Sequence, residues 1–228
     1  MKEIIKIGHR GAAGYEPENT LRSFQKAIDL GVDMIEVDVF ACKSGEVVAL
    51  HDPKLQRTTS GHGYVIKKSL RELKMLDAGK GERIPTLEEV FDLVNRRVKI
   101  NIEIKGARSL RSVIRIVNKY VYEKGWRYDD FLVSCVTRHS LRKIFKINPQ
   151  LPVGAILIYK PNRFLAFAVQ INAYSVNVRF RLLNAVFVEK AHQRGLKVFA
   201  WTVNEPEDIK RMKALGVDGI FSDYPDRI

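Results

Sequence analysis

The chain has 228 residues, of which 46% are hydrophobic and 29% are charged, and its formal net charge is +13. This composition is that of a globular protein with a substantial core, and it excludes a chain that is disordered throughout. No run of about 18 apolar residues is present, so the sequence predicts no transmembrane helix and no stable membrane insertion. The apolar stretch at the N-terminus (MKEIIKIGH) is too short and too soon polar for a signal peptide. We therefore expect a cytoplasmic protein.

The positive charge attracts anions in general, including phosphodiesters, anionic membranes and nucleic acids. Charge alone therefore identifies no partner. Basic patches interleaved with stacking aromatic residues, which single-strand binders use, are not evident, and we expect no nucleic-acid partner.

Segments typical of strands and helices alternate along almost the whole chain. Eight such units in about 230 residues favour an α/β fold of the closed (β/α)8 TIM-barrel type, forming one domain over residues 1–228. The alternative is an open doubly wound sheet, which usually has a GxGxxG turn after its first strand, and that turn is absent here. The expected strands are 4–8, 33–39, 99–105, 131–135, 153–157, 172–176, 197–201 and 218–222.

Three helices have recognisable ends. Residues 20–30 place apolar side chains on one face and end at Gly31. Thr86 has capping-box spacing to Glu89, which predicts a helix start. Residues 204–207, with Pro206 between Asn204 and Glu207, predict the start of a helix that stops at Gly216.

One segment interrupts the alternation after the second strand. A turn at residues 43–46 is followed by an apolar run at 47–50, which predicts a hairpin. Residues 53–85 then contain no long helical pattern. We expect them to form a small insertion over one mouth of the barrel, serving as a lid or as a substrate contact.

On two of the apolar strands, the ionisable residues lie together on one face of the strand. Because side chains alternate along a strand, Glu36 and Asp38 point to one side, and Asn101, Glu103 and Lys105 do the same on the next barrel strand. The isoleucines and valines on the other faces would pack under the outer helices. The polar faces would then point into the barrel, near the strand ends where barrel enzymes have their active sites.

The carboxylates of Glu36, Asp38 and Glu103 would repel one another if they were unpaired. A hard divalent cation such as Mg, Ca or Mn resolves this, because it prefers carboxylate oxygens and keeps open positions for water or substrate. The alternative is a buried salt-bridge network without a metal, for instance between Glu103 and Lys105 or Arg10.

Two histidines lie at strand ends beside these carboxylates, His9 in GHRG and His51 in HD. Such a pair suits acid–base hydrolysis, and Arg10 and Lys105 offer a planar and a point-like cation for a phosphate group. Asp52 either orients His51 or bridges to the backbone.

Other candidates have weaker signals. Trp201 ends a predicted strand and either forms an apolar wall for an alcohol moiety or packs in the core. We interpret Asp218 and Asp223, which flank the last strand, as turn and cap residues. His62, His139 and His192 do not share the position of His9 and His51 at strand ends beside carboxylates, and we interpret them as surface or helix residues.

These residues occur in motifs that resemble those of the glycerophosphodiester phosphodiesterases, in the same order and over nearly the whole chain. The matching runs are residues 9–11 (HRG), 17–20 (PENT), 36–39 (EVDV), 51–52 (HD), 57–61 (RTTSG), 103–105 (EIK), 201–204 (WTVN) and 216–225 (GVDGIFSDYP). The chain departs from the family at Ser134–Cys135, where Ser-Phe is common, and residues 156–183 are less typical.

The resemblance implies a (β/α)8 barrel with an insertion after the second strand. It also implies hydrolysis of glycerophosphodiesters to glycerol 3-phosphate and an alcohol, with one divalent cation held by Glu36, Asp38 and Glu103. His9 and His51 would be the acid–base pair, with Arg10 and Lys105 near the phosphate. Two alternatives remain open: a lysophospholipase D or phospholipase C-like enzyme acting on lipids, and a non-catalytic barrel that binds phosphate-bearing ligands.

Overall fold

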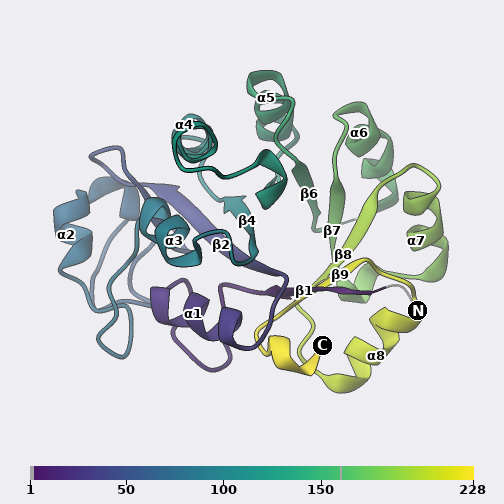
Figure 1. The fold of residues 1–228 in the computed structure, drawn as a ribbon, viewed down its shortest axis with the longest axis horizontal. Coiled ribbons are helices and arrows are strands. Elements are labelled where there is room, and N and C mark those ends of the chain that lie inside the picture. Colours follow the sequence, from purple (N-terminus) through teal and green to yellow (C-terminus); the bar gives the residue numbers. More distant parts are fainter. Residues whose placement is uncertain (1–2, 160) are drawn as a thin grey trace.

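The computed structural model describes residues 3–159 and 161–228, and helices surround a central set of strands (Figure 1). The hydrogen-bonded strand order is β1-β9-β8-β7-β6-β5-β4-β2, and β1 also pairs with β2, so eight parallel strands close into a barrel. The predicted (β/α)8 fold is confirmed. The parallel strands are β1 (Ile5–Gly8), β2 (Met34–Ala41), β4 (Lys99–Ile104), β5 (Phe131–Cys135), β6 (Val153–Leu157), β7 (Ser175–Arg179), β8 (Lys197–Trp201) and β9 (Gly219–Ser222).

The helices begin largely where the sequence predicts. The side chain of Thr20 accepts a hydrogen bond from the Ser23 amide at the start of α1, and the capping box of Thr86 with Glu89 is present at the start of α3. The helices are α1 (Leu21–Asp29), α2 (Leu70–Lys74), α3 (Leu87–Val94), α4 (Ser109–Glu123), α5 (Arg138–Ile147), α6 (Leu165–Gln170), α7 (Ala185–His192) and α8 (Pro206–Ala214).

One predicted strand boundary was wrong, and one helix that starts within the predicted residues has a different N-cap. The strand expected at 172–176 is β7 at Ser175–Arg179, because Asn172 adopts a left-handed backbone (φ 49°) in the preceding turn. Helix α8 starts with Pro206 in its first turn, after the N-cap Glu205, and has no side-chain cap. Asn204 instead turns its side chain toward the loop after β9.

The hairpin and the insertion lie beside β2. Strand β3 (Val47–Ala49) pairs antiparallel with β2, as predicted. The insertion at 53–85 contains the short helices η1 (Val65–Lys67) and α2. Its Leu55, Val65 and Leu73 are buried against Phe40 and Val48 in a small core of their own. This packing anchors the insertion to the hairpin, and its role as a lid stays a prediction.

The sheet register brings the polar faces of two strands together. In the β2–β4 pair, Glu36 lies opposite Asn101 and Asp38 lies opposite Glu103. The alternating apolar residues of the same strands are buried in the main core with the outer helices, as predicted: Ile35, Val37, Val39, Ile100, Ile102 and Ile104. Burial of this face against the helices therefore forces the carboxylates toward the barrel axis.

Within the described residues, no helix is both long enough and apolar enough to cross a lipid bilayer.

Candidate active site

A pocket opens at the carboxyl ends of the barrel strands, where the sequence predicted the site. Seven of the eight predicted site residues line it, and Asp38 lies beneath it, buried to 1% exposure. The lining residues are His9, Arg10, Glu36, His51, Asn101, Glu103, Lys105, Val136, Ile156, Ile158, Asn177, Arg179, Trp201, Thr202 and Phe221. The structure thus brings together residues from segments far apart in the sequence.

Three carboxylates converge in this pocket. One oxygen from each of Glu36, Asp38 and Glu103 lies within 4.8 Å of the others. The Arg10 amide donates a hydrogen bond to Glu36 Oε2 (2.8 Å), while Glu36 Oε1 is buried without a hydrogen-bond partner. A buried, unpartnered carboxylate oxygen beside two other carboxylates is the donor set that a hard divalent cation takes. The residues therefore fit such an ion.

The electrostatics of the three carboxyl groups differ. Burial, with the nearby charges of Asp38 and Glu103, raises the pKa of Glu36 well above its ordinary value. Burial and the Asp38 charge also raise the pKa of Glu103. Burial acts in the same direction on Asp38, but the adjacent Lys105 and Arg10 outweigh it and lower the pKa of Asp38. Protein cations thus stabilise Asp38 as an anion, whereas Glu36 lacks full compensation.

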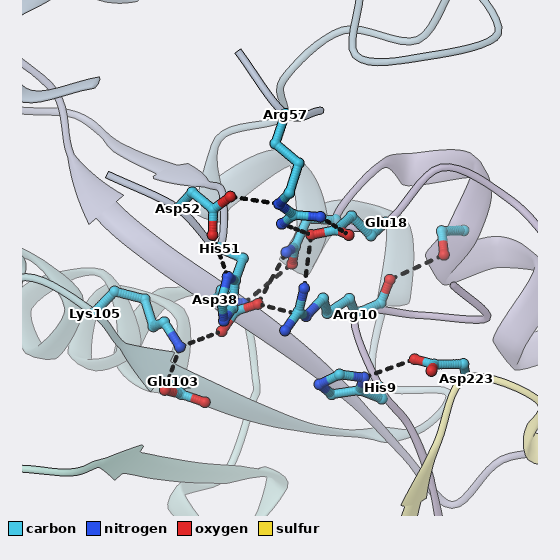
Figure 2. Close-up of polar contacts among 12 residues, drawn as sticks. His9, Arg10, Glu18, Asp38, His51, Asp52, Arg57, Glu103, Lys105 and Asp223 are labelled. Atoms are coloured by element: carbon cyan, nitrogen blue, oxygen red, sulfur yellow. Dashed lines mark hydrogen bonds and ion pairs between the residues drawn. The ribbon is translucent and has the colours of Figure 1, made fainter. Parts of the chain in front are cut away.

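The two predicted phosphate-binding cations lie on opposite sides of Asp38 (Figure 2). Lys105 Nζ lies 2.6 Å from Glu103 Oε1 and 3.3 Å from Asp38 Oδ1, and Arg10 Nε lies 3.2 Å from Asp38 Oδ2. Of the salt bridges considered for the metal-free alternative, the one between Glu103 and Lys105 is present, whereas Arg10 pairs with Asp38 and Glu18. Two cations against three carboxylates still leave one negative charge in this group, so the salt bridges and a cation site are compatible.

Asn19, from the PENT motif, forms two hydrogen bonds with Asp38. Its side-chain amide donates to Asp38 Oδ2 (3.0 Å), and its Oδ1 accepts from the Asp38 amide (3.1 Å). The residue adopts a left-handed backbone (φ 57°), which asparagine tolerates better than most residues. Asn19 thereby fixes which oxygen of Asp38 faces the other carboxylates.

Each predicted catalytic histidine is bound to an aspartate through Nδ1. His9 Nδ1 lies 2.7 Å from Asp223 Oδ1, and His51 Nδ1 lies 2.6 Å from Asp52 Oδ1 (Figure 2). Because an ionised carboxylate can only accept, we assign the Nδ1 proton to each ring, which leaves Nε2 free for chemistry. Of the two roles considered for Asp52, orientation of His51 is the one the structure shows.

The interpretation of Asp223 as a turn residue was wrong, because it is the partner of His9. Burial opposes its ionisation, but hydrogen bonds from His9 and Asn204 lower the pKa of Asp223. The strand register contained the signal: Gly8 pairs with Ser222, so His9 and Asp223 are each the next residue after a paired position. By contrast, Asp218 bonds His192 (2.7 Å) and the Val198 amide at the opposite end of β9, which is a structural role.

The motif residues Glu18 and Arg57 form a clamp that the individual residues did not predict. The Arg57 guanidinium donates two hydrogen bonds to Glu18 (both 2.7 Å) and a further one to Asp52. Glu18 also accepts from Arg10 Nη1 (2.9 Å). The insertion therefore reaches the site through Arg57, which connects Asp52 to Glu18 and hence to Arg10.

The remaining pocket wall is mainly apolar, formed by Val136, Ile156, Trp201 and Phe221. Trp201 is half-buried, and the Arg179 guanidinium lies 5.6 Å from the centroid of its ring. Trp201 lines the pocket at the barrel mouth and also packs against the buried cluster that contains Phe199 and Phe221, so both roles considered for it are compatible with the structure. Such a wall suits the alcohol half of a substrate better than its phosphate.

Comparison with known proteins connects this geometry to a family. Residues 9–227 match the model of the glycerophosphoryl diester phosphodiesterase family. A glycerophosphodiester phosphodiesterase of Caldanaerobacter subterraneus is 37% identical over all of this chain and 97% of its own length. A human lysophospholipase D is 26% identical over 97% of this chain and 84% of its own length.

Solved structures give the same result. An Oleispira antarctica phosphodiesterase, solved with its product sn-glycerol 3-phosphate, superposes with a TM-score of 0.91 at 28% identity. The alignment covers 97% of this chain and 94% of that one. The family match over nearly the whole chain and the shared barrel agree, and the chain belongs to the glycerophosphoryl diester phosphodiesterase family of enzymes.

Proposed function

We propose that the protein hydrolyses glycerophosphodiesters to sn-glycerol 3-phosphate and an alcohol, using one divalent cation (Mg, Ca or Mn) and a histidine acid–base pair. The observation that carries this proposal is the juxtaposition in one pocket of three carboxylates with two aspartate-bound histidines. The Oleispira antarctica enzyme, solved with sn-glycerol 3-phosphate, supports the choice of product.

Glu36, Asp38 and Glu103 would hold the cation. When bound, such an ion supplies Lewis-acid stabilisation of the negative charge that accumulates on the phosphate oxygens. Arg10 and Lys105 border the same carboxylates, so their cationic groups are placed to bind the remaining phosphate oxygens.

The histidines would move the protons. With Nδ1 bonded to Asp223, the neutral ring of His9 presents an unprotonated Nε2, and we assign it the role of the base that deprotonates the nucleophile. His51, held by Asp52, would act as the imidazolium that protonates the leaving alcohol oxygen through Nε2. The two aspartates stabilise the charged rings and prevent their rotation.

The nucleophile is either water or the neighbouring glycerol hydroxyl, which would give a cyclic phosphate that water then opens. Single-turnover phosphorus NMR distinguishes the two routes. A transient cyclic phosphate ester indicates attack by the hydroxyl, whereas its absence at all times indicates direct attack by water.

The substrate class is tested by comparing glycerol 3-phosphate release from glycerophosphocholine with choline release from micellar lysophosphatidylcholine. We expect the water-soluble diester to have the higher kcat/KM, because polar groups surround the catalytic centre and the apolar wall is short. Turnover of the lysolipid alone would instead support the lysophospholipase D alternative, which the human relative motivates.

His9→Ala and His51→Ala should each lower kcat by about a hundredfold or more, since general acid–base catalysis contributes that much. His139→Ala, which changes an exposed histidine outside the pocket, is the matched control and should leave kcat unchanged. A loss of less than threefold in either of the first two variants would show that its histidine has a structural role.

A further inference from the structure

The charge of this protein is concentrated in one continuous part of the chain. Residues 131–188, which run from β5 to α7, contain no aspartate or glutamate. They contain eight basic residues, so this part has a formal charge of +8 against +13 for the whole chain. The eight are Arg138, Arg142, Lys143, Lys146, Lys160, Arg163, Arg179 and Arg181.

Four of the five arginines of this part, all except Arg163, lie close to aromatic rings. The Arg138 guanidinium lies 4.4 Å from the centroid of Phe164, and Arg181 lies 5.5 Å from that of Phe180. Among the described residues, no salt bridge involves any position from 131 to 188. Their charge is therefore available to a partner outside the chain.

Apolar side chains are exposed in the same region, directly after three successive barrel strands. Val136 follows β5 and is 40% exposed, Tyr159 lies just after β6 and is 72% exposed, and Leu182 in the turn after β7 is 36% exposed. Because parallel strands share their direction around a barrel, these three residues lie at the end where the catalytic pocket opens. Val136 itself lines that pocket.

The basic rim, as we name it, consists of these apolar residues and the exposed arginines in the same connections: Val136, Arg138, Tyr159, Arg163, Arg179, Arg181 and Leu182. We propose that the basic rim docks the enzyme peripherally on an anionic lipid surface. Arginines would attract the lipid phosphates while Tyr159 and its apolar neighbours enter the headgroup layer. The other half of the mouth has its acidic residues Glu18, Asp52 and Asp223 already paired within the site.

A membrane fits the basic rim better than a nucleic acid does. The rings of Phe164, Phe167 and Trp201 are covered by guanidinium groups and do not form a row of free stacking surfaces. Valine and leucine at the exposed tips gain free energy only in an apolar layer. Docking would also direct the pocket opening toward the lipid surface.

Flotation of the full chain with lipid vesicles in about 0.1 M salt tests this proposal. Binding should be at least tenfold tighter to phosphatidylcholine vesicles with about one third phosphatidylglycerol than to pure phosphatidylcholine, because each basic residue near the surface adds to the attraction. Equal binding to both compositions, or no binding to either, would overturn the proposal.

Charge reversal locates the docking surface. Arg163→Glu with Arg181→Glu should weaken vesicle binding tenfold or more. Neither residue lines the pocket, so kcat/KM for glycerophosphocholine should stay unchanged and report an intact fold. The matched control is Lys146→Glu with Arg194→Glu, which reverses two exposed charges at the far ends of α5 and α7: Lys146 lies in the last turn of α5, and Arg194 follows α7. Equal losses in both double variants would show diffuse attraction and contradict a defined docking surface.

The apolar contribution has its own test at constant charge. Tyr159→Ser should weaken vesicle binding about threefold or more, whereas Tyr122→Ser, at a 76% exposed tyrosine in the last turn of α4, should not. Binding to a labelled DNA duplex tests the alternative that the basic rim recognises nucleic acid. DNA binding that is lost in Arg163→Glu with Arg181→Glu, together with no vesicle binding, would assign the basic rim to nucleic acid and refute the lipid proposal.

Discussion

At the scale of single residues, the site depends on which carboxylates have partners inside the protein. Asp38 forms ion pairs with Arg10 and Lys105, Asp52 and Asp223 each bond a histidine ring, and the pKa of each of these aspartates is lowered. Glu36 has only a backbone donor on one oxygen, and its pKa is raised. The paired aspartates position other groups, while Glu36 is left for a ligand that the protein does not supply.

Asp223→Asn should lower kcat by about a hundredfold, because the amide cannot hold the Nδ1–H tautomer of His9 or stabilise its charged form. Steady-state kinetics on glycerophosphocholine measures this. Asp226→Asn, which removes the charge of an exposed residue bonded to the Tyr15 hydroxyl, is the neighbouring control and should retain full activity. A kcat for Asp223→Asn within threefold of the wild type would show that Asp223 does not support His9.

Glu36 should also make the stability of the metal-free protein depend on pH. Its folded-state pKa lies above the ordinary 4.5, so the folded state binds more protons than the unfolded state above that pH, and stability falls as pH rises toward the folded pKa. As the pH rises from about 5 to about 7, the melting temperature of Glu36→Gln should therefore fall less than that of the wild type.

Thermal unfolding in EDTA measures this difference. Adding back a divalent cation should raise the melting temperature of the wild type and raise that of Glu36→Gln less, because only the wild type retains all three carboxylate ligands. Identical pH dependence and identical metal response in the two proteins would contradict the assigned role of Glu36.

At the scale of elements, the short segments that follow the strands position His51 and Arg57, while the regular strands hold these segments in place. The hairpin sets His51 next to Asp38, since the Leu50 amide donates to the Asp38 carbonyl (2.9 Å). The insertion then delivers Arg57 to both Asp52 and Glu18. The insertion thus contributes to the geometry of the groups proposed to be catalytic.

Arg57→Ala should lower kcat by roughly tenfold, because Asp52 and Glu18 lose their shared partner and His51 is less firmly oriented. Arg71→Ala, on the exposed side of α2, is the control within the same insertion and should not change kcat. Full activity of Arg57→Ala would mean that the clamp is dispensable for orientation of His51.

Strand periodicity predicted the elements that carry the site, and the reason is physical. On β2 and β4 the alternation of isoleucine or valine with ionisable residues left only one arrangement that buries the apolar face, so Glu36, Asp38 and Glu103 could be placed from sequence. The β7 boundary was missed because helix α6 ends in a left-handed turn at Asn172, where the Ala173 amide donates to the Ala168 carbonyl (2.9 Å), and the strand begins only after this turn.

At the scale of the whole molecule, closure of the barrel creates the contacts that no local pattern contains. His9 and Asp223 lie 214 positions apart and meet because β1 pairs with β9. Asn204 has the spacing of a helix cap, yet its side chain bonds Asp223 because the β8 and β9 ends are adjacent. Sequence reasoning therefore missed Asp223 as the partner of His9, whereas it named orientation of His51 as one of two roles for Asp52.

Metal dependence tests the central claim most directly. Glycerol 3-phosphate release from glycerophosphocholine should fall at least a hundredfold in EDTA, return with Mg, Ca or Mn, and remain absent in Glu36→Gln under every condition. Undiminished release in EDTA, or full activity of Glu36→Gln, would contradict the assignment of the three carboxylates as a catalytic cation site.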